Sequence, residues 1–194
     1  MTPEALAEAC AALEGDRVLI AVAGPPASGK STLADKAVAR MPDAALVAMD
    51  GFHLDDAVLR AKGLLDRKGA PQTFDLGGLA RALAAIRDGG EVFVPVFDRS
   101  REEAIAAKGV VPADARVVVV EGNWLLLDRE GWRDLGPWDL TVLLDVPEPE
   151  LRARLEARWA GLDPDARRTK IEGNDLPNAR LVREGSRTPD LMVP

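Results

Sequence analysis

The segment from Gly24 to Ser31 fits the phosphate-binding pattern G-x-x-x-x-G-K-[ST] at every position. The glycines of this pattern let the backbone turn tightly around an anion, so that successive N–H groups point at a phosphate. Lys30 adds a full positive charge, and Ser31 offers a hydroxyl to a magnesium ion. A helix that begins here directs its positive end at the same phosphates. The loop therefore predicts a bound nucleoside triphosphate.

The residues around the loop supply the context that the motif requires. Residues 17–23 form a short apolar run rich in β-branched side chains, and residues 32–40 carry apolar side chains at helical spacing. Strand, loop and helix thus follow in the expected order. An ordinary Gly-Pro loop followed by a surface lysine is the alternative interpretation. Nucleotide contacts are expected from Gly24, Ala27, Ser28, Gly29, Lys30, Ser31 and Thr32.

Composition narrows the class of protein. With 194 residues, 47% of them hydrophobic, the chain suits a single domain with one substantial core. Its 25 basic and 32 acidic residues give a net charge of −7, the opposite of a nucleic-acid-binding surface. Cys10 is the only cysteine, which excludes an internal disulfide and a cysteine-rich zinc site. No apolar run approaches the roughly 18 residues of a membrane span. We expect a cytoplasmic protein with a small-molecule substrate, no nucleic-acid or membrane partner, and a homodimer as one option.

The rest of the chain predicts strands alternating with helices. Strands are expected at residues 44–49, 92–97, 117–120 and 140–144, with residues 190–193 as a candidate last strand. Helices are expected from Thr2 to near Gly15, within Leu54–Arg67, from Asp75 to Arg87 and from Glu148 to Trp159. Pro95 makes its strand an edge strand, and Arg101–Ala115 is expected to be a short loop. Continuous apolar strands separated by helices predict an α/β fold in three layers, α/β/α, around a mostly parallel five-stranded sheet.

Two carboxylates stand where chemistry is expected. Ligands of open α/β sheets bind outside the carboxyl ends of the strands. Asp50 ends the second predicted strand, and Glu121 follows the run from Val117 to Val120. Asp50 is positioned to act as a base for an acceptor hydroxyl, and Glu121 to hold magnesium together with Ser31, directly or through water. A structural role, such as opening a turn, is the alternative for each carboxylate.

Several further segments carry a resemblance that spans nearly the whole chain. They are Met49–Leu54, Arg67–Asp75, Pro95–Ser100, Val120–Leu126, Leu151–Trp159 and Asn174–Val182. In this order they resemble the P-loop kinases that include uridine kinases, phosphoribulokinases and bacterial pantothenate kinases. Within that group the chain is most similar to small bacterial proteins named nucleoside/nucleotide kinase or fructose-transport-system kinase. The resemblance implies a P-loop fold, ATP and Mg²⁺ as cofactors, and one kinase domain over residues 1–194 with a small helical lid at about residues 159–175.

The resemblance also implies roles for single residues. It makes Asp50 the catalytic base and places Arg154 and Arg158 in a lid that closes over the phosphates beside Lys30. A solvated helix face, paired with neighbouring glutamates, is the alternative for these arginines. Adenine is expected near residues 183–189. Substrate contacts are expected from Phe52, His53, Asp98 and Arg99, the last two as clamps for a polyol or sugar.

Pantothenate itself fits poorly. Pantothenate kinases are longer, with inserted segments around the pantothenate and coenzyme A region, and the present chain contains no tyrosine. The function predicted is ATP-dependent phosphorylation of a hydroxyl on a sugar, nucleoside or related alcohol. Three alternatives to this function remain. One is a mononucleotide kinase, and the other two belong to different classes of protein.

The first rival is a GTPase-type switch, which needs an N/T-K-x-D string after a strand. The nearest string, Thr169–Glu172, has Glu in place of Asp. The second rival is a non-catalytic nucleotide-binding regulator. It would keep the phosphate loop but have no need of Asp50.

Overall fold

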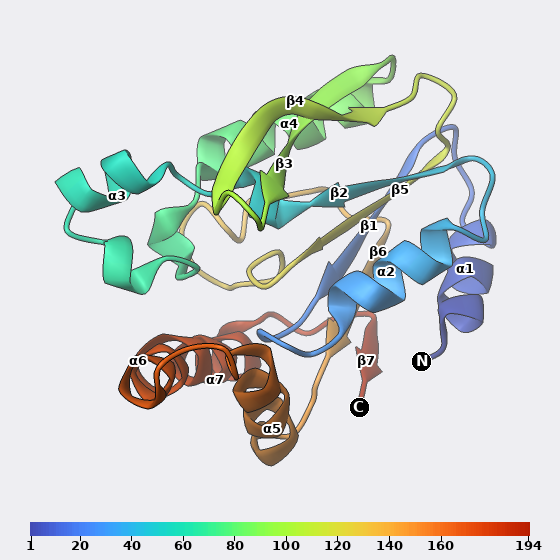
Figure 1. The fold of residues 1–194 in the computed structure, drawn as a ribbon. Coiled ribbons are helices and arrows are strands. Elements are labelled where there is room, and N and C mark those ends of the chain that lie inside the picture. Colours follow the sequence, from blue (N-terminus) through green and yellow to red (C-terminus); the bar gives the residue numbers. More distant parts are fainter.

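The computed structural model describes residues 1–194 and contains a main sheet of five parallel strands in the order β2-β5-β1-β6-β7 (Figure 1). The strands of this sheet are β1 (Val18–Ala23), β2 (Ala44–Ala48), β5 (Val117–Gly122), β6 (Leu140–Leu144) and β7 (Leu191–Val193). The helices are α1 (Pro3–Ala11), α2 (Lys30–Val38), α3 (Asp56–Ala61), α4 (Leu76–Asp88), α5 (Glu148–Arg158), α6 (Pro164–Lys170) and α7 (Leu176–Gly185). The predicted α/β fold with a five-stranded parallel sheet is confirmed.

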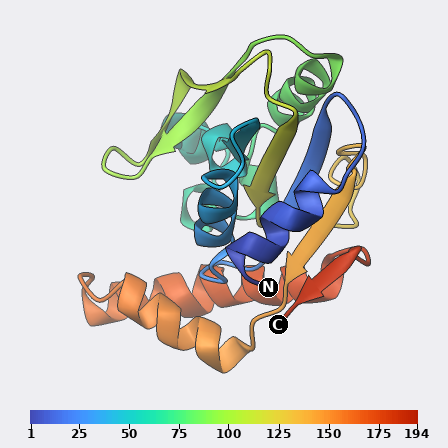
Figure 2. The ribbon, with the colours of Figure 1, turned by 90° about the vertical axis from the view of Figure 1, so that its right-hand side faces the viewer.

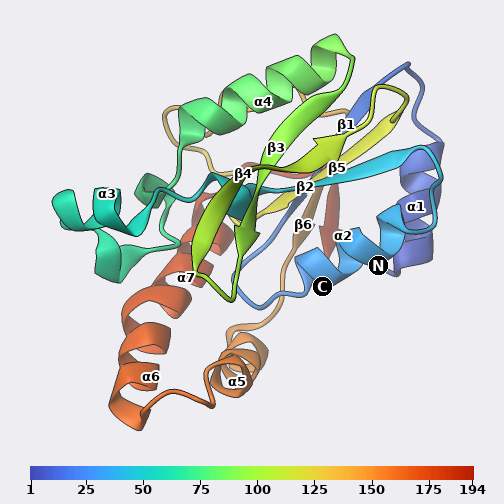
Figure 3. The same ribbon diagram turned by 45° about the horizontal axis from the view of Figure 1, so that its top comes forward.

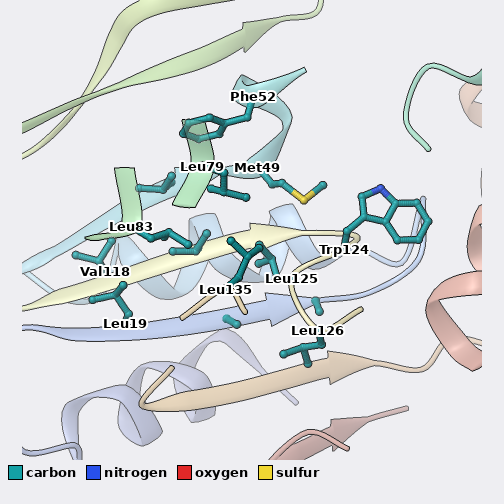
Figure 4. Packing of buried hydrophobic residues seen from close by; sticks show 14 of the residues in the cluster. Leu19, Met49, Phe52, Leu79, Leu83, Val118, Trp124, Leu125, Leu126 and Leu135 are labelled. Atoms are coloured by element: carbon teal, nitrogen blue, oxygen red, sulfur yellow. The ribbon is translucent and has the colours of Figure 1, made fainter. Parts of the chain in front are cut away.

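Alternate residues of β1 enter two separate cores. Val18, Ile20 and Val22 pack with α1 and α2 on one face of the sheet. Leu19 and Ala21 pack on the other face with residues of α4, as Figure 4 shows for Leu19 among its neighbours. Because successive strand side chains point to opposite faces, a fully apolar strand must be covered on both sides. This gives the three layers predicted from the sequence.

Side-chain caps explain where two of the helices begin. Thr2 Oγ1 accepts a hydrogen bond from Ala5 N at 3.2 Å, with Pro3 in the first turn of α1. Asp75 Oδ1 accepts one from Gly78 N at 2.8 Å at the start of α4. Both starts agree with the sequence prediction, whereas α1 ends earlier than expected, at Ala11.

The strand predicted at residues 92–97 is present, but its place in the main sheet and the loop predicted after it were wrong. Residues 92–97 do not join the main sheet: β3 (Val92–Asp98) pairs with β4 (Glu103–Val111) as a separate antiparallel hairpin. The expected loop of residues 101–115 thus holds a strand, and β7 supplies the fifth parallel strand instead. Pro95 does lie at an irregularity, where the register shifts between Val94 and Val96. In Figure 1 the hairpin and α4 lie above the main sheet.

The last three helices form a separate group next to the sheet. Figures 2 and 3 show α5, α6 and α7 together on one side of the molecule, opposite α4. A π-helical turn, Ile171–Asp175, joins α6 to α7 without a break. Leu155, Ile171 and Leu176 form a small apolar cluster that holds the group together. None of the helices combines the length and the hydropathy that crossing a bilayer requires.

Candidate active site

The phosphate loop leaves β1 and leads directly into α2. Gly29 caps α2 with a φ of 93°, in the left-handed region that favours glycine. Ala27 has a φ of 62°, which is uncommon for a residue with a Cβ. The guanidinium of Arg154 donates hydrogen bonds to the carbonyl oxygens of Ala27 at 3.1 Å and Ser28 at 2.9 Å. A charged side chain of α5 thus holds the tight turn in place, beside the positive end of α2.

A cleft of about 290 Å³ opens at this loop and reaches the residues that follow β2 and β5. Its basic side chains are Lys30, Lys68, Arg99, Arg158 and Lys170, and its acidic side chains are Asp50, Glu102 and Asp175. The cleft is therefore net positive, although the whole chain carries −7. Concentrating cations in a concave site raises its affinity for an anion such as a polyphosphate.

Asp50 lies in the cleft on a 3₁₀ turn, Met49–Phe52, that follows β2. Its carboxylate accepts a hydrogen bond from Arg99 at 2.9 Å. Its carbonyl oxygen accepts one from Nδ1 of His53 at 2.8 Å, so this nitrogen carries the proton. Burial lowers the pKa of His53 below its ordinary value of 6.5, which keeps the imidazole neutral near pH 7.

The hairpin supplies one wall of the cleft. A Cβ on Gly51 would collide with the carbonyl group of Pro95, so the absence of a side chain lets β3 approach the 3₁₀ turn closely. The approach brings Phe97 and Arg99 to the cleft. The rings of His53 and Phe97 stack with their centroids 4.9 Å apart. The hairpin that sequence patterns missed is thus the element that positions Arg99.

Glu121 is the buried carboxylate at the end of β5, only 5% exposed. Burial raises its pKa above the ordinary value of 4.5, while Lys30 and a hydrogen bond from Ser31 act in the opposite direction. Ser31 and Glu121 are oxygen donors of the kind that Mg²⁺ prefers. No group of three or more His, Cys, Asp or Glu side chains is close enough to hold a metal by itself. This pair fits an ion that takes its remaining ligands from phosphates and water.

The turn at residues 68 and 69 also lines the cleft. Trp124 Nε1 donates to the Gly69 carbonyl at 3.0 Å, and Asn174 Nδ2 donates to the Lys68 carbonyl at 2.8 Å. The Lys68 ammonium bonds to Asp56 Oδ1 and to a backbone carbonyl of the hairpin, both at 2.7 Å. The turn is thereby tied to the segment that follows β5, to the π-helical turn and to the hairpin.

The candidate lid contributes an aromatic ring that two cations approach. Arg158 and Lys170 lie over the ring of Trp159, at 5.0 and 5.4 Å from its centroid. Trp159 Nε1 donates to Asp175 Oδ2 at 2.7 Å. All four side chains line the cleft, and burial raises the pKa of Asp175. Residues 158–175 thus bring two cations, Arg158 and Lys170, and one carboxylate, Asp175, to the cleft.

Three residues expected at the site lie elsewhere. Phe52 is buried in the core beside Met49 and Leu79, so it packs the turn rather than lining the cleft (Figure 4). Asp98 faces away: Ser100 and Lys108 hydrogen-bond its carboxylate and hold its pKa below the usual range. Arg154 touches the cleft only indirectly, through the loop carbonyls, and pairs with Glu150.

The other predicted site residues meet in or beside one cleft. Lys30, Asp50, His53, Arg99 and Arg158 all line it, and Glu121 contacts it through Ser31. Among the cleft residues that no role had been predicted for are Trp159, Asn123 and Asn178. All three lie in segments that carried the family resemblance, which was the available signal. Residues 183–189, expected near adenine, do not line this cleft.

Known proteins match this architecture. A family model described as an AAA domain matches residues 20–172. The crystal structure of a putative fructose transport system kinase from Silicibacter sp. TM1040 is 43% identical, with a TM-score of 0.91 over 100% of both chains. The chain belongs to the P-loop kinase family. This kinase is also 31% identical to the putative uridine kinase C227.14 of Schizosaccharomyces pombe, over 91% of this chain and 83% of that protein. It is 33% identical to protein YggC of Escherichia coli, over 91% and 77% of the two chains.

Proposed function

We propose that this kinase transfers the γ-phosphoryl group of ATP to a hydroxyl of a small metabolite, such as a sugar, a nucleoside or a related alcohol. One observation carries the proposal: the Asp50 carboxylate and the Lys30 ammonium line the same cleft. A carboxylate base beside a phosphate-binding loop is the minimum that hydroxyl phosphorylation requires.

The chemistry asks the protein for positioning and for charge neutralisation. The acceptor oxygen forms a bond to the γ-phosphorus, the bond from that phosphorus to the β,γ-bridging oxygen breaks, and ADP leaves. The hydroxyl proton passes to Asp50, which Arg99 holds in place. Lys30 and the loop N–H groups orient the triphosphate. Mg²⁺, held at Ser31 and Glu121, would neutralise phosphate charge when bound.

We further propose that residues 159–175 act as a lid. Arg158 and Lys170 would meet the charge of the triphosphate on the side opposite Lys30. Closure excludes water, which otherwise competes with the acceptor for the γ-phosphoryl group.

The two rivals have weaker support. The string closest to a guanine-reading motif, Thr169–Glu172, runs from α6 into the π-helical turn rather than following a strand. A regulator that only binds nucleotide has no use for a carboxylate in the cleft, whereas Asp50 is there and is oriented by Arg99.

The test is ADP release measured with a panel of hydroxylated metabolites, for the wild type and for Asp50→Asn. The Asn side chain keeps the shape but loses the basic site, so turnover should fall by roughly 10²–10⁴-fold. Nucleotide affinity, measured by titration, should change little. Asp35→Asn, an exposed carboxylate on α2, is the control. Full turnover in Asp50→Asn would remove this residue from the mechanism, and no stimulation by any metabolite would favour the regulator.

A further inference from the structure

Two buried amides next to the cleft form a hydrogen-bond relay with a fixed direction. Asn174 and Asn178 are each 2% exposed. Asn174 Nδ2 donates to the carbonyl oxygen of Lys68 at 2.8 Å, and Asn178 Nδ2 donates to Asn174 Oδ1 at 3.4 Å. A backbone carbonyl can only accept, so Asn174 must turn its NH₂ group toward Lys68 and its oxygen toward Asn178. Asn178 must in turn present its NH₂ group to Asn174.

This hydrogen-bond relay leaves one acceptor atom, Oδ1 of Asn178, without a donor. Asn178 Oδ1 is buried and has no hydrogen-bond partner in the protein, and Asn178 lines the cleft. Asn123, on another wall of the same cleft, also has a buried Oδ1 without a partner. A buried polar atom without a partner is costly, and such atoms are retained mainly where function uses them. Amide oxygens accept hydrogen bonds, so the missing partner is a donor such as a hydroxyl or N–H group.

The π-helical turn sets up this arrangement. It places Asn174 one helical turn before Asn178, within reach of the Lys68 carbonyl. Single π-helical turns are uncommon and occur frequently at functional sites. The local backbone and the amide relay therefore point to the same place in the cleft.

The two cleft cations that belong to the hairpin or contact it are already paired with carboxylates. The Lys68 ammonium bonds to Asp56 at 2.7 Å, and the Arg99 guanidinium bonds to Asp50 at 2.9 Å. Glu102 adds a further carboxylate to the lining. A substrate carboxylate or phosphate here would have to displace an existing ion pair and would meet amide oxygens that cannot donate to it. A neutral molecule with several hydroxyls satisfies the oxygens and leaves both ion pairs intact.

We propose that Asn178 is a substrate-recognition residue, oriented by Asn174 as a positioning residue, and that the phosphate acceptor is a neutral polyhydroxy compound that donates a hydroxyl hydrogen to Asn178 Oδ1. This assignment rests on the proposed kinase function and narrows it to one substrate class. It excludes acceptors that already carry a carboxylate or a phosphate.

The substrate class is tested with matched pairs of neutral and anionic compounds. ADP release by the wild type is measured with glycerol and D-glycerate, D-glucose and D-gluconate, and D-ribose, ribose 5-phosphate, uridine and uridine monophosphate. We expect the neutral members alone to stimulate release. Preference for an anionic member overturns the assignment and keeps the kinase function. Stimulation by neither class overturns both.

The role of Asn178 is tested with the best neutral acceptor. In Asn178→Ala the KM for the acceptor should rise about 5- to 100-fold, because a donor of the bound substrate loses its partner, while the KM for ATP stays within about 2-fold. Asn178→Asp keeps an acceptor oxygen at this position and should recover part of the affinity. Asn174→Ala should raise the same KM by a smaller factor, because Asn178 can then rotate. Arg180→Ala, on the same helix but paired with Glu148, is the control.

If Asn178→Ala does not fold, the same hydrogen bond can be tested by changing the acceptor compound instead of the protein. The wild type is assayed with monodeoxy analogues of the acceptor. One deoxy position other than the phosphorylated one should reproduce the rise in KM. If every deoxy analogue matches the parent compound, or if Asn178→Ala leaves the acceptor KM unchanged, the assignment is wrong and the kinase function stands.

Discussion

Arg154 and Arg158 lie one turn apart on α5, yet they occupy different environments. Positions i and i+4 share a face of a helix, so a sequence pattern assigns both arginines to one task. In the fold, Arg154 bonds to the carbonyls of Ala27 and Ser28, whereas Arg158 lies in the cleft over the Trp159 ring. Which of the two arginines reaches the cleft depends on how α5 packs against the phosphate loop. This packing belongs to the tertiary structure and cannot be read from the local sequence.

The two arginines should therefore give different kinetic defects. Arg154→Ala removes two hydrogen bonds that hold the phosphate loop, so the Kd for ATP should rise about 3- to 30-fold. Arg158→Ala should mainly lower kcat, on the order of 10²-fold, if its charge is engaged only when the transition state forms. Steady-state kinetics with nucleotide titration separates these effects. Arg168→Ala, exposed and paired with Asp165, is the control. The same small loss of stability in both variants, with no kinetic change, would support a solvated helix face instead.

Lys30 is the lysine of the phosphate-binding motif, so its role in binding the triphosphate follows directly from the sequence. Lys30→Ala should weaken phosphoryl transfer severely, on the order of 10²-fold or more, because it removes a charge that compensates the triphosphate. The fold should be unaffected, since Lys30 belongs to no apolar cluster. Circular dichroism and thermal melting check this, and Lys36→Ala, exposed on the same helix, is the control. Unfolding at ambient temperature or unchanged turnover would contradict the prediction.

At the scale of elements, the parallel strands were predictable and the hairpin was not. The strands β1 and β5 read as uninterrupted apolar runs, the pattern expected of strands buried on both faces. The sequence of β4 contains three alanines, a glycine and a lysine and lacks strict alternation, so its pairing with β3 determines its structure. The consequence for the site is direct, because this hairpin delivers Arg99 to Asp50.

Removing one hydrogen bond within the proposed lid tests whether that bond helps to keep the lid closed. Trp159→Phe keeps an aromatic ring for Arg158 and Lys170 to contact but removes the N–H group that binds Asp175. We expect a looser lid, so that ADP release in the absence of acceptor rises relative to acceptor-dependent release, by about 2- to 10-fold for the loss of one hydrogen bond. Trp138→Phe, outside the cleft, is the control. An unchanged ratio would show that this bond does not couple the lid to the exclusion of water.

Across the whole molecule, the sequence predicted the edge of the sheet at which the cleft opens but not the helical residues that complete its lining. Asp50 and Glu121 are each only a few positions from a recognisable strand, and the carboxyl ends of parallel strands meet at one edge. Asn123, Asn178 and Trp159 come to the cleft from segments more than 50 residues apart at the extremes. Their convergence depends on how α7 and the helices before it pack against the sheet, and no local periodicity encodes that packing.

Burying the charged carboxylate of Glu121 lowers the stability of the whole fold. Its folded-state pKa is raised by burial, so the native protein keeps this proton to higher pH than the unfolded chain does. As pH rises from 4.5 through the raised value, the native state binds more protons than the unfolded state, and the free energy of unfolding falls. Glu121→Gln removes this penalty. Without ligands its Tm should exceed that of the wild type at pH 8, by roughly 2–4 °C for each kcal/mol of penalty removed from a chain of this size.

At pH 5 the difference in Tm should be smaller, because less of the penalty is present. Turnover should fall in the same variant, since the amide offers Mg²⁺ a weaker ligand than a carboxylate. Melting curves at both pH values with a magnesium titration of activity test this, and Glu8→Gln, exposed on α1, is the control. A Tm that drops at both pH values would mean that the attraction between Glu121 and Lys30 outweighs the cost of burying the carboxylate. Glu121 would then stabilise the fold, and the trade between stability and activity proposed for this site would not exist.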